Sequence, residues 1–126
     1  MNDEQGTRAL SRTAASPARQ WRRRLVGTVA AAVDATPGVT RREASIADFF
    51  RGLRGSGGPG DPAETGIRVS ASGSAVAVSV HLSVDGSDPA LRVGERVREA
   101  VAEAVAAEGW VPTSVEVAIL DVGDIG

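Results

Sequence analysis

Three stretches in the second half of the chain alternate apolar and polar residues with a period of two. They cover residues 67–71, 76–84 and 115–119, and the first two are separated only by a short Ser-Gly-Ser connection. Alternation of this length predicts strands with one buried and one solvated face. The short polar connection predicts a hairpin turn between the first two strands.

Two longer stretches carry apolar residues at helical spacing. We expect the first helix to begin at Ser16-Pro17 and to stop at Thr36-Pro37-Gly38. Its apolar stripe consists of Trp21, Leu25, Val29 and Val33. We expect the second helix to begin at Asp88-Pro89, with Asp88 as its cap, and to end at Gly109 in the left-handed conformation. Its apolar stripe consists of Val93, Val97, Val101 and Val105.

The segment between the first helix and the hairpin is less regular. Residues 39–42 are compatible with a short strand, and Ser45 is placed to cap a brief helix. The apolar residues of that helix are Ile46, Phe49, Phe50 and Leu53. Residues 54–65 are rich in Gly and Pro, which is typical of a flexible surface loop.

These elements predict an α+β fold in which two main helices pack on one face of a small sheet. The sheet is expected to be mixed and three- to four-stranded, in the order α-β-β-β-α-β. Residues 1–16 are polar and patternless and predict a disordered arm, residues 17–122 a single domain, and residues 123–126 a tail. The outward sheet face is expected to be small and polar, and such faces and their unpaired edges favour association with copies or partners.

Composition excludes several kinds of chemistry. The chain has 126 residues and no Cys, so disulfides, thiol catalysis and zinc–thiolate sites are excluded. It has one His, which leaves no histidine cluster for a metal. No apolar run approaches the roughly 20 residues needed to span a bilayer. We therefore expect no catalytic residue, no cofactor, no metal and no small-molecule substrate.

Charge is distributed unevenly along the chain. Residues 1–60 carry ten Arg against five acidic residues, whereas residues 61–126 carry four Arg against eleven acidic residues. The basic residues at the start of the first helix, together with one aromatic residue, are the candidate contact with an anionic partner: Arg19, Trp21, Arg22, Arg23 and Arg24. A solvated basic face and an export signal, with residues 25–33 as its apolar core, are the alternative interpretations.

Three further patterns are compatible with chemistry, and each has a simpler explanation. His81 lies between Ser79 and Ser83 on the solvated face of a strand, but residues two apart are roughly 7 Å apart, too far for a direct hydrogen bond. Glu95, Glu99 and Glu103 form a helical stripe that neighbouring arginines can neutralise without a metal. The Gly-x-x-Gly at residues 52–55 resembles a nucleic-acid clamp, but here a loop and a strand follow it.

Three blocks of the sequence together resemble the alkaline shock protein family, the envelope stress response proteins of bacteria. They are the Ala/Val helix and Pro-Gly-Val turn at residues 29–39, the Gly-Ile-Arg-Val strand at residues 66–69, and the helix and strand at residues 93–101 and 115–119. The resemblance covers residues 25–122. The strand with which many members of the family begin is replaced here by the Arg/Ser/Ala arm.

The resemblance implies a cytoplasmic, non-enzymatic interaction or scaffold protein of the envelope stress response. It implies a homo-oligomer, peripheral at the inner face of the membrane, that docks on a membrane-protein partner or an anionic membrane surface. The family supplies no catalytic residues that could be carried over. The alternative function is a small nucleic-acid-binding module that uses the Arg-rich N-terminal half, including Arg51 and Arg54.

Overall fold

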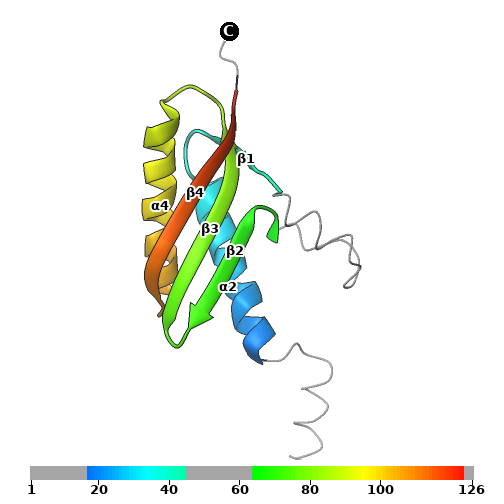
Figure 1. The fold of residues 1–126 in the computed structure, drawn as a ribbon, viewed down its shortest axis with the longest axis vertical. Helices are drawn as coiled ribbons and strands as arrows, with labels where there is room; N and C mark the ends of the chain where they lie inside the picture. The colour runs from blue at the N-terminus through cyan, green and yellow to red at the C-terminus, as the bar shows by residue number, and fades with distance from the viewer. Residues whose placement is uncertain (1–16, 45–63, 124–126) are drawn as a thin grey trace, which may run out of the picture.

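A computed structural model of the protein describes residues 17–44 and 64–123. Two helices and four strands follow one another in the order α-β-β-β-α-β, as the sequence predicts (Figure 1). They are α2 (Pro17–Asp34), β1 (Val39–Arg42), β2 (Ile67–Ser72), β3 (Ala75–Val84), α4 (Ala90–Ala107) and β4 (Val111–Val122). The predicted arm, the brief helix at residues 46–53, most of the Gly/Pro loop and the end of the tail lie outside the described residues.

The sheet is mixed and is built around β3. Strand β4 runs parallel to β3 along its whole length, from the pair Ala75–Val111 to the pair Val84–Val122. Strands β1 and β2 are both antiparallel to β3. Because β4 occupies one side of β3 completely, β1 and β2 must share the other side.

Strands β1 and β2 therefore form one interrupted edge strand. The chain leaves this edge after Glu43 and returns to it at Gly66, and both residues meet β3 at His81. The backbone N–H of Glu43 donates to the His81 carbonyl at 2.8 Å, and the His81 N–H donates to the Gly66 carbonyl at 2.8 Å. β1 and β2 thus pair with successive parts of β3, and the segment between Ala44 and Thr65 is an insertion between them.

Both helices cover the same face of the sheet, as the sequence predicts (Figure 1). The core between helices and sheet is almost entirely aliphatic. Its most deeply buried side chains are Leu25, Val29, Val33, Val76, Val80, Leu82, Val84, Val93, Val97, Val101 and Val105. The predicted stripes of both helices lie in this list, except that Trp21 is only half-buried at its margin. The period-two and period-four patterns therefore identify the core correctly.

Several element ends differ from the sequence-based expectation. Asp88 does not cap α4: the cap position is Pro89, without a side-chain hydrogen bond, and Asp88 accepts a hydrogen bond from Arg96 instead. Strand β4 extends beyond Leu120 and ends at Val122. Gly109 ends α4 with a φ of 93°, as expected.

Neither of the helices in the described part of the chain is long and apolar enough to cross a membrane.

Candidate functional site

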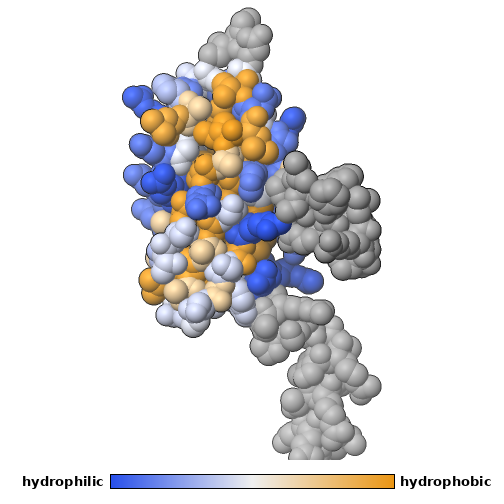
Figure 2. Space-filling model, in the orientation of Figure 1, coloured by the Kyte–Doolittle hydropathy of each residue, from blue (hydrophilic) through white to orange (hydrophobic). Residues whose placement is uncertain are grey.

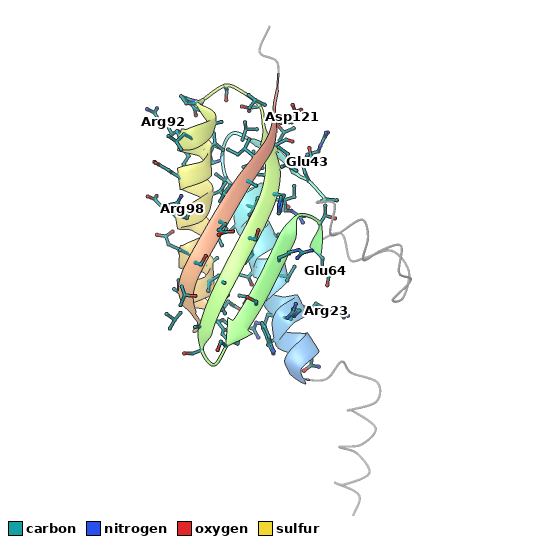
Figure 3. The ribbon with its side chains drawn as sticks, viewed as in Figure 1. Arg23, Glu43, Glu64, Arg92, Arg98 and Asp121 are labelled. Atoms are coloured by element: carbon teal, nitrogen blue, oxygen red, sulfur yellow. The ribbon has the colours of Figure 1, made fainter. Side chains whose placement is uncertain are left out.

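The candidate contact surface lies on the first turns of α2. Arg22, Arg23 and Arg24 are all exposed there, and Trp21 is half-buried. Arg19 belongs to the same helix, but its side chain is not among those described. These residues are consecutive or one turn apart, so the helix presents them at one end of the domain. In Figure 3, Arg23 is seen on this first part of α2.

The two tryptophans of the chain hold this end of the domain together. Trp21 on α2 meets Trp110, which directly precedes β4, with ring centroids 5.1 Å apart at an interplanar angle of 43°. Tilted aromatic pairs at this distance are attractive. Arg22 lies over the Trp21 ring at 5.5 Å, in a cation–π contact. Arg22 is therefore in contact with the aromatic pair that joins the start of α2 to the end of α4.

The three arginines differ in what they already contact. Arg24 pairs with Glu108 at the end of α4, at 2.9 Å, although its own side chain remains 79% exposed. Arg22 is stacked on Trp21. Arg23 makes no ion pair with any of the described residues. It is thus the member of the cluster whose charge is most available to a partner.

The helix adds to the positive potential of this surface. The first turn of α2 contains no acidic residue, and the N-terminus of a helix carries a partial positive charge. Glu108 is the acidic side chain that the described residues supply to the cluster. A positive surface that is only partly neutralised can bind phosphate groups, carboxylates or an anionic lipid surface.

A second polar cluster lies where the interrupted edge strand leaves the sheet. The Ser83 hydroxyl donates to the Glu43 carboxylate, and Arg41 Nε donates to the same oxygen at 2.9 Å. The hydrogen bond from Ser83, and then the contact with Arg41, lower the pKa of Glu43 below 4.5. The Ser83 hydroxyl and Arg41 Nε both have their acceptor within the cluster, so we regard it as a structural junction.

The structure does not bring His81 and a serine together as a catalytic pair. Ser83 lies on the outward face, as predicted, but it is only 4% exposed and its hydroxyl is directed to Glu43. In the described part of the chain, His81 makes no side-chain hydrogen bond. The expectation that Ser83 faces solvent is therefore wrong, because the Glu43 carboxylate contacts it there.

The carboxylate stripe on α4 is exposed, as the sequence predicts. Glu95, Glu99 and Glu103 all face solvent. They do not pair with the α4 arginines within the described residues; Arg96 pairs with Asp88 instead, at 2.8 Å. No group of three potential metal ligands occurs in residues 17–44 and 64–123. The Gly-x-x-Gly at residues 52–55 lies outside the described residues.

Sequence reasoning did not anticipate that Trp110 and Glu108 belong to the candidate surface. Trp110 directly precedes β4, and its ring meets Trp21 on α2. No periodicity in the chain indicates this contact, because three strands and the insertion between Ala44 and Thr65 separate α2 from α4 in the sequence.

Comparison with known proteins supports the fold and extends no further. No protein-family model matches the chain, and no curated protein matches it. A single-substitution variant of the MamM C-terminal domain superposes with a TM-score of 0.50 and 16% identity, over 81% of this chain and 96% of that one. A double-substitution variant of the same domain gives 0.50 and 17%, over 85% and 99%. The chain is thus similar in fold to the MamM C-terminal domain.

Proposed function

We propose that this protein is a non-catalytic interaction protein of the bacterial cell envelope. It acts in the cytoplasm, self-associates, and docks at the inner face of the membrane through the first turns of α2. The surface that contacts the membrane or a membrane-associated partner consists of Arg19, Trp21, Arg22, Arg23 and Arg24, and we refer to it as the basic surface.

The observation that carries this proposal is the incomplete neutralisation of the basic surface. Three consecutive arginines are exposed at the positive end of a helix, and only Arg24 has an acidic partner among the described residues. Each arginine near an anionic leaflet contributes about 1 kcal/mol of attraction. The tryptophan pair joins the start of α2 to the end of α4 beside these arginines.

The envelope setting comes from the resemblance to the alkaline shock protein family. The fold agrees with the element order that this resemblance implies over residues 25–122. The same basic surface would serve a nucleic-acid-binding module, which is the alternative function. The two functions differ in the partner that the arginines select, so the experiment offers both partners.

The test is co-sedimentation of the purified full chain with phosphatidylcholine vesicles, with and without phosphatidylglycerol. We expect binding only to the anionic vesicles, reversed by high salt. Arg23→Glu should weaken this binding about 10- to 30-fold, because it reverses one charge without removing an ion pair seen in the structure. Arg98→Glu is the matched control: it makes the same change at an exposed arginine on α4 (Figure 3).

Equal losses of vesicle binding in Arg23→Glu and Arg98→Glu would show that binding depends on the net charge of the protein and not on the basic surface. An oligomer of single-stranded RNA is tested in parallel. Binding to RNA with a steep salt dependence, and no binding to anionic vesicles, would transfer the assignment to the nucleic-acid function.

A further inference from the structure

The two edges of the sheet are very different. The edge made by β1 and β2 is interrupted between Glu43 and Gly66, and its strands are only four and six residues long. It carries Arg41, Arg42 and Arg68. Short strands and charged side chains are features that keep an edge from pairing with another chain. This edge is therefore protected.

The edge made by β4 is longer, and no insertion interrupts it. It is a single strand of twelve residues, and within the described residues it pairs only with β3. Val117 is only half-buried, whereas its neighbour Val80 on β3 is fully buried. Leu120 and Val122, further along β4, are each 52% exposed. Figure 2 shows apolar surface gathered over the end of β4.

Two irregularities limit the part of β4 that can add a regular partner. The pairing with β3 shifts between Val76 and Ala77, and again between Leu82 and Ser83. Residues 114–119 lie between these shifts, in unbroken register. Their side chains alternate, with Val115, Val117 and Ile119 toward the helices and the intervening residues on the outward face.

We propose that β4 pairs antiparallel with β4 of a second copy, around a twofold axis at Val117. This inference rests on the self-association included in the proposed function, and it names the surface responsible. The axis is perpendicular to the sheet, so both pairs of helices cover the same face of one continuous sheet. Val117 then lies opposite the partner's Val117, and Val115 opposite the partner's Ile119. On the outward face, Glu116 lies opposite the partner's Ala118.

Neighbouring registers are less favourable for reasons that the sequence supplies. An axis at Glu116 places two glutamates directly opposite each other, and like charges in that position repel. An axis at Ala118 places Asp121 opposite Val115 and Glu116 opposite Leu120, so each carboxylate meets an apolar side chain. The Val117 register is the one that matches apolar residues on the helix face without opposing two charges.

The interface would be modest in size. A contact made mainly by one strand edge lies at the small end of specific interfaces. We therefore expect a weak dimer. The dimer should consequently assemble and dissociate reversibly as the concentration of the protein changes.

The decisive comparison uses two substitutions at one outward position. Ala118→Glu places a second carboxylate opposite the partner's Glu116, twice per dimer, whereas Ala118→Lys places an opposite charge there. We expect Ala118→Glu to raise the dissociation constant about tenfold and Ala118→Lys to leave it unchanged or lower it. Sedimentation equilibrium of the full chain over a range of concentrations measures this. Thermal unfolding at low concentration verifies that both variants fold.

The register is tested separately with cysteine, since the chain has none. Val117→Cys should form an intermolecular disulfide on mild oxidation, because a residue on the axis lies beside its own copy. Ser114→Cys should not form this disulfide. In the Val117 register Ser114 lies opposite the partner's Leu120, so the two substituted residues are six positions apart. Equal cross-linking of both variants, identical effects of the two Ala118 substitutions, or a monomer at every concentration would overturn the interface.

These results are distinguishable from those for the basic surface. A dimer with the expected Ala118 and Val117 behaviour that ignores anionic vesicles would support this interface and contradict the membrane-contact function. A strictly monomeric protein that binds anionic vesicles through Arg23 would overturn this interface and support the basic surface.

Discussion

At the scale of single residues, similar side chains have different roles because of their neighbours. Arg22 is stacked on Trp21, Arg24 is paired with Glu108, and Arg23 has neither kind of contact within the described residues. The sequence shows three equivalent arginines in a row. Only the positions of the neighbouring helix end and of Trp110 distinguish them, and no periodicity in the chain encodes those positions.

The Glu43 carboxylate is a residue whose environment has a measurable consequence. Its pKa is lowered by the hydrogen bond from Ser83 and by Arg41, so the charged form is favoured in the folded state. Its contribution to stability is therefore complete above the unfolded-state value of 4.5 and is lost as the pH falls through the lowered folded-state pKa.

We expect Glu43→Gln to lower the free energy of unfolding at neutral pH and to differ less from the parent as the solution becomes acidic. Urea unfolding of both proteins at neutral pH and at several values below 4.5 measures the difference. Asp121→Asn is the control, because Asp121 is exposed and accepts no hydrogen bond from the described residues. A difference that stays constant with pH would contradict the role of the Glu43 charge.

At the scale of elements, the central feature is that β1 and β2 form one edge strand interrupted by an insertion. Gly66 makes this possible, because the backbone that enters β2 passes very close to the backbone of Glu43, which follows β1. A Cβ on Gly66 would lie 2.6 Å from the His81 carbonyl oxygen and 2.8 Å from that of Glu43. Its φ of 75° is also unfavourable for other residues.

We therefore expect Gly66→Ala to destabilise the domain by about 1–3 kcal/mol, through backbone strain and the clash with two carbonyls. Gly27→Ala is the opposite case: Gly27 lies inside α2 with nothing within 4 Å of its added Cβ. That substitution should stabilise the domain by about 1 kcal/mol. Chemical unfolding of both variants measures the two changes in the free energy of unfolding. A Gly66→Ala protein as stable as the parent would contradict the close backbone approach at Gly66.

Hydrophobic periodicity predicts the core and the order of the elements, but it underestimates β4. The sequence predicts a strand at residues 115–119, and the structure has one from Val111 to Val122. The reason is physical: the register shifts at either end of this stretch each add one residue to β4. Alternation is broken there, although strand pairing continues. The sharing of one edge by β1 and β2 could not be read from the sequence, because the insertion separates them.

At the scale of the whole molecule, the core, the basic surface and the β4 edge lie on different parts of the domain. The helices and one face of the sheet form an aliphatic core, the start of α2 presents positive charge, and the edge of β4 is the surface that we propose for contact with a second copy. A dimer through β4 would carry two basic surfaces. Two weak contacts on one anionic surface bind more strongly than one, which joins self-association to membrane docking.

The proposed function requires that the basic surface holds the protein at the membrane. The most direct measurement is the fraction of the full chain that sediments with membranes from its own cells, in low and in high salt. We expect the parent and Arg98→Glu to sediment in low salt and to be released in high salt, and Arg23→Glu to remain in the supernatant in both. A parent protein that stays in the supernatant in low salt, or an Arg23→Glu variant that sediments as the parent does, would contradict the account.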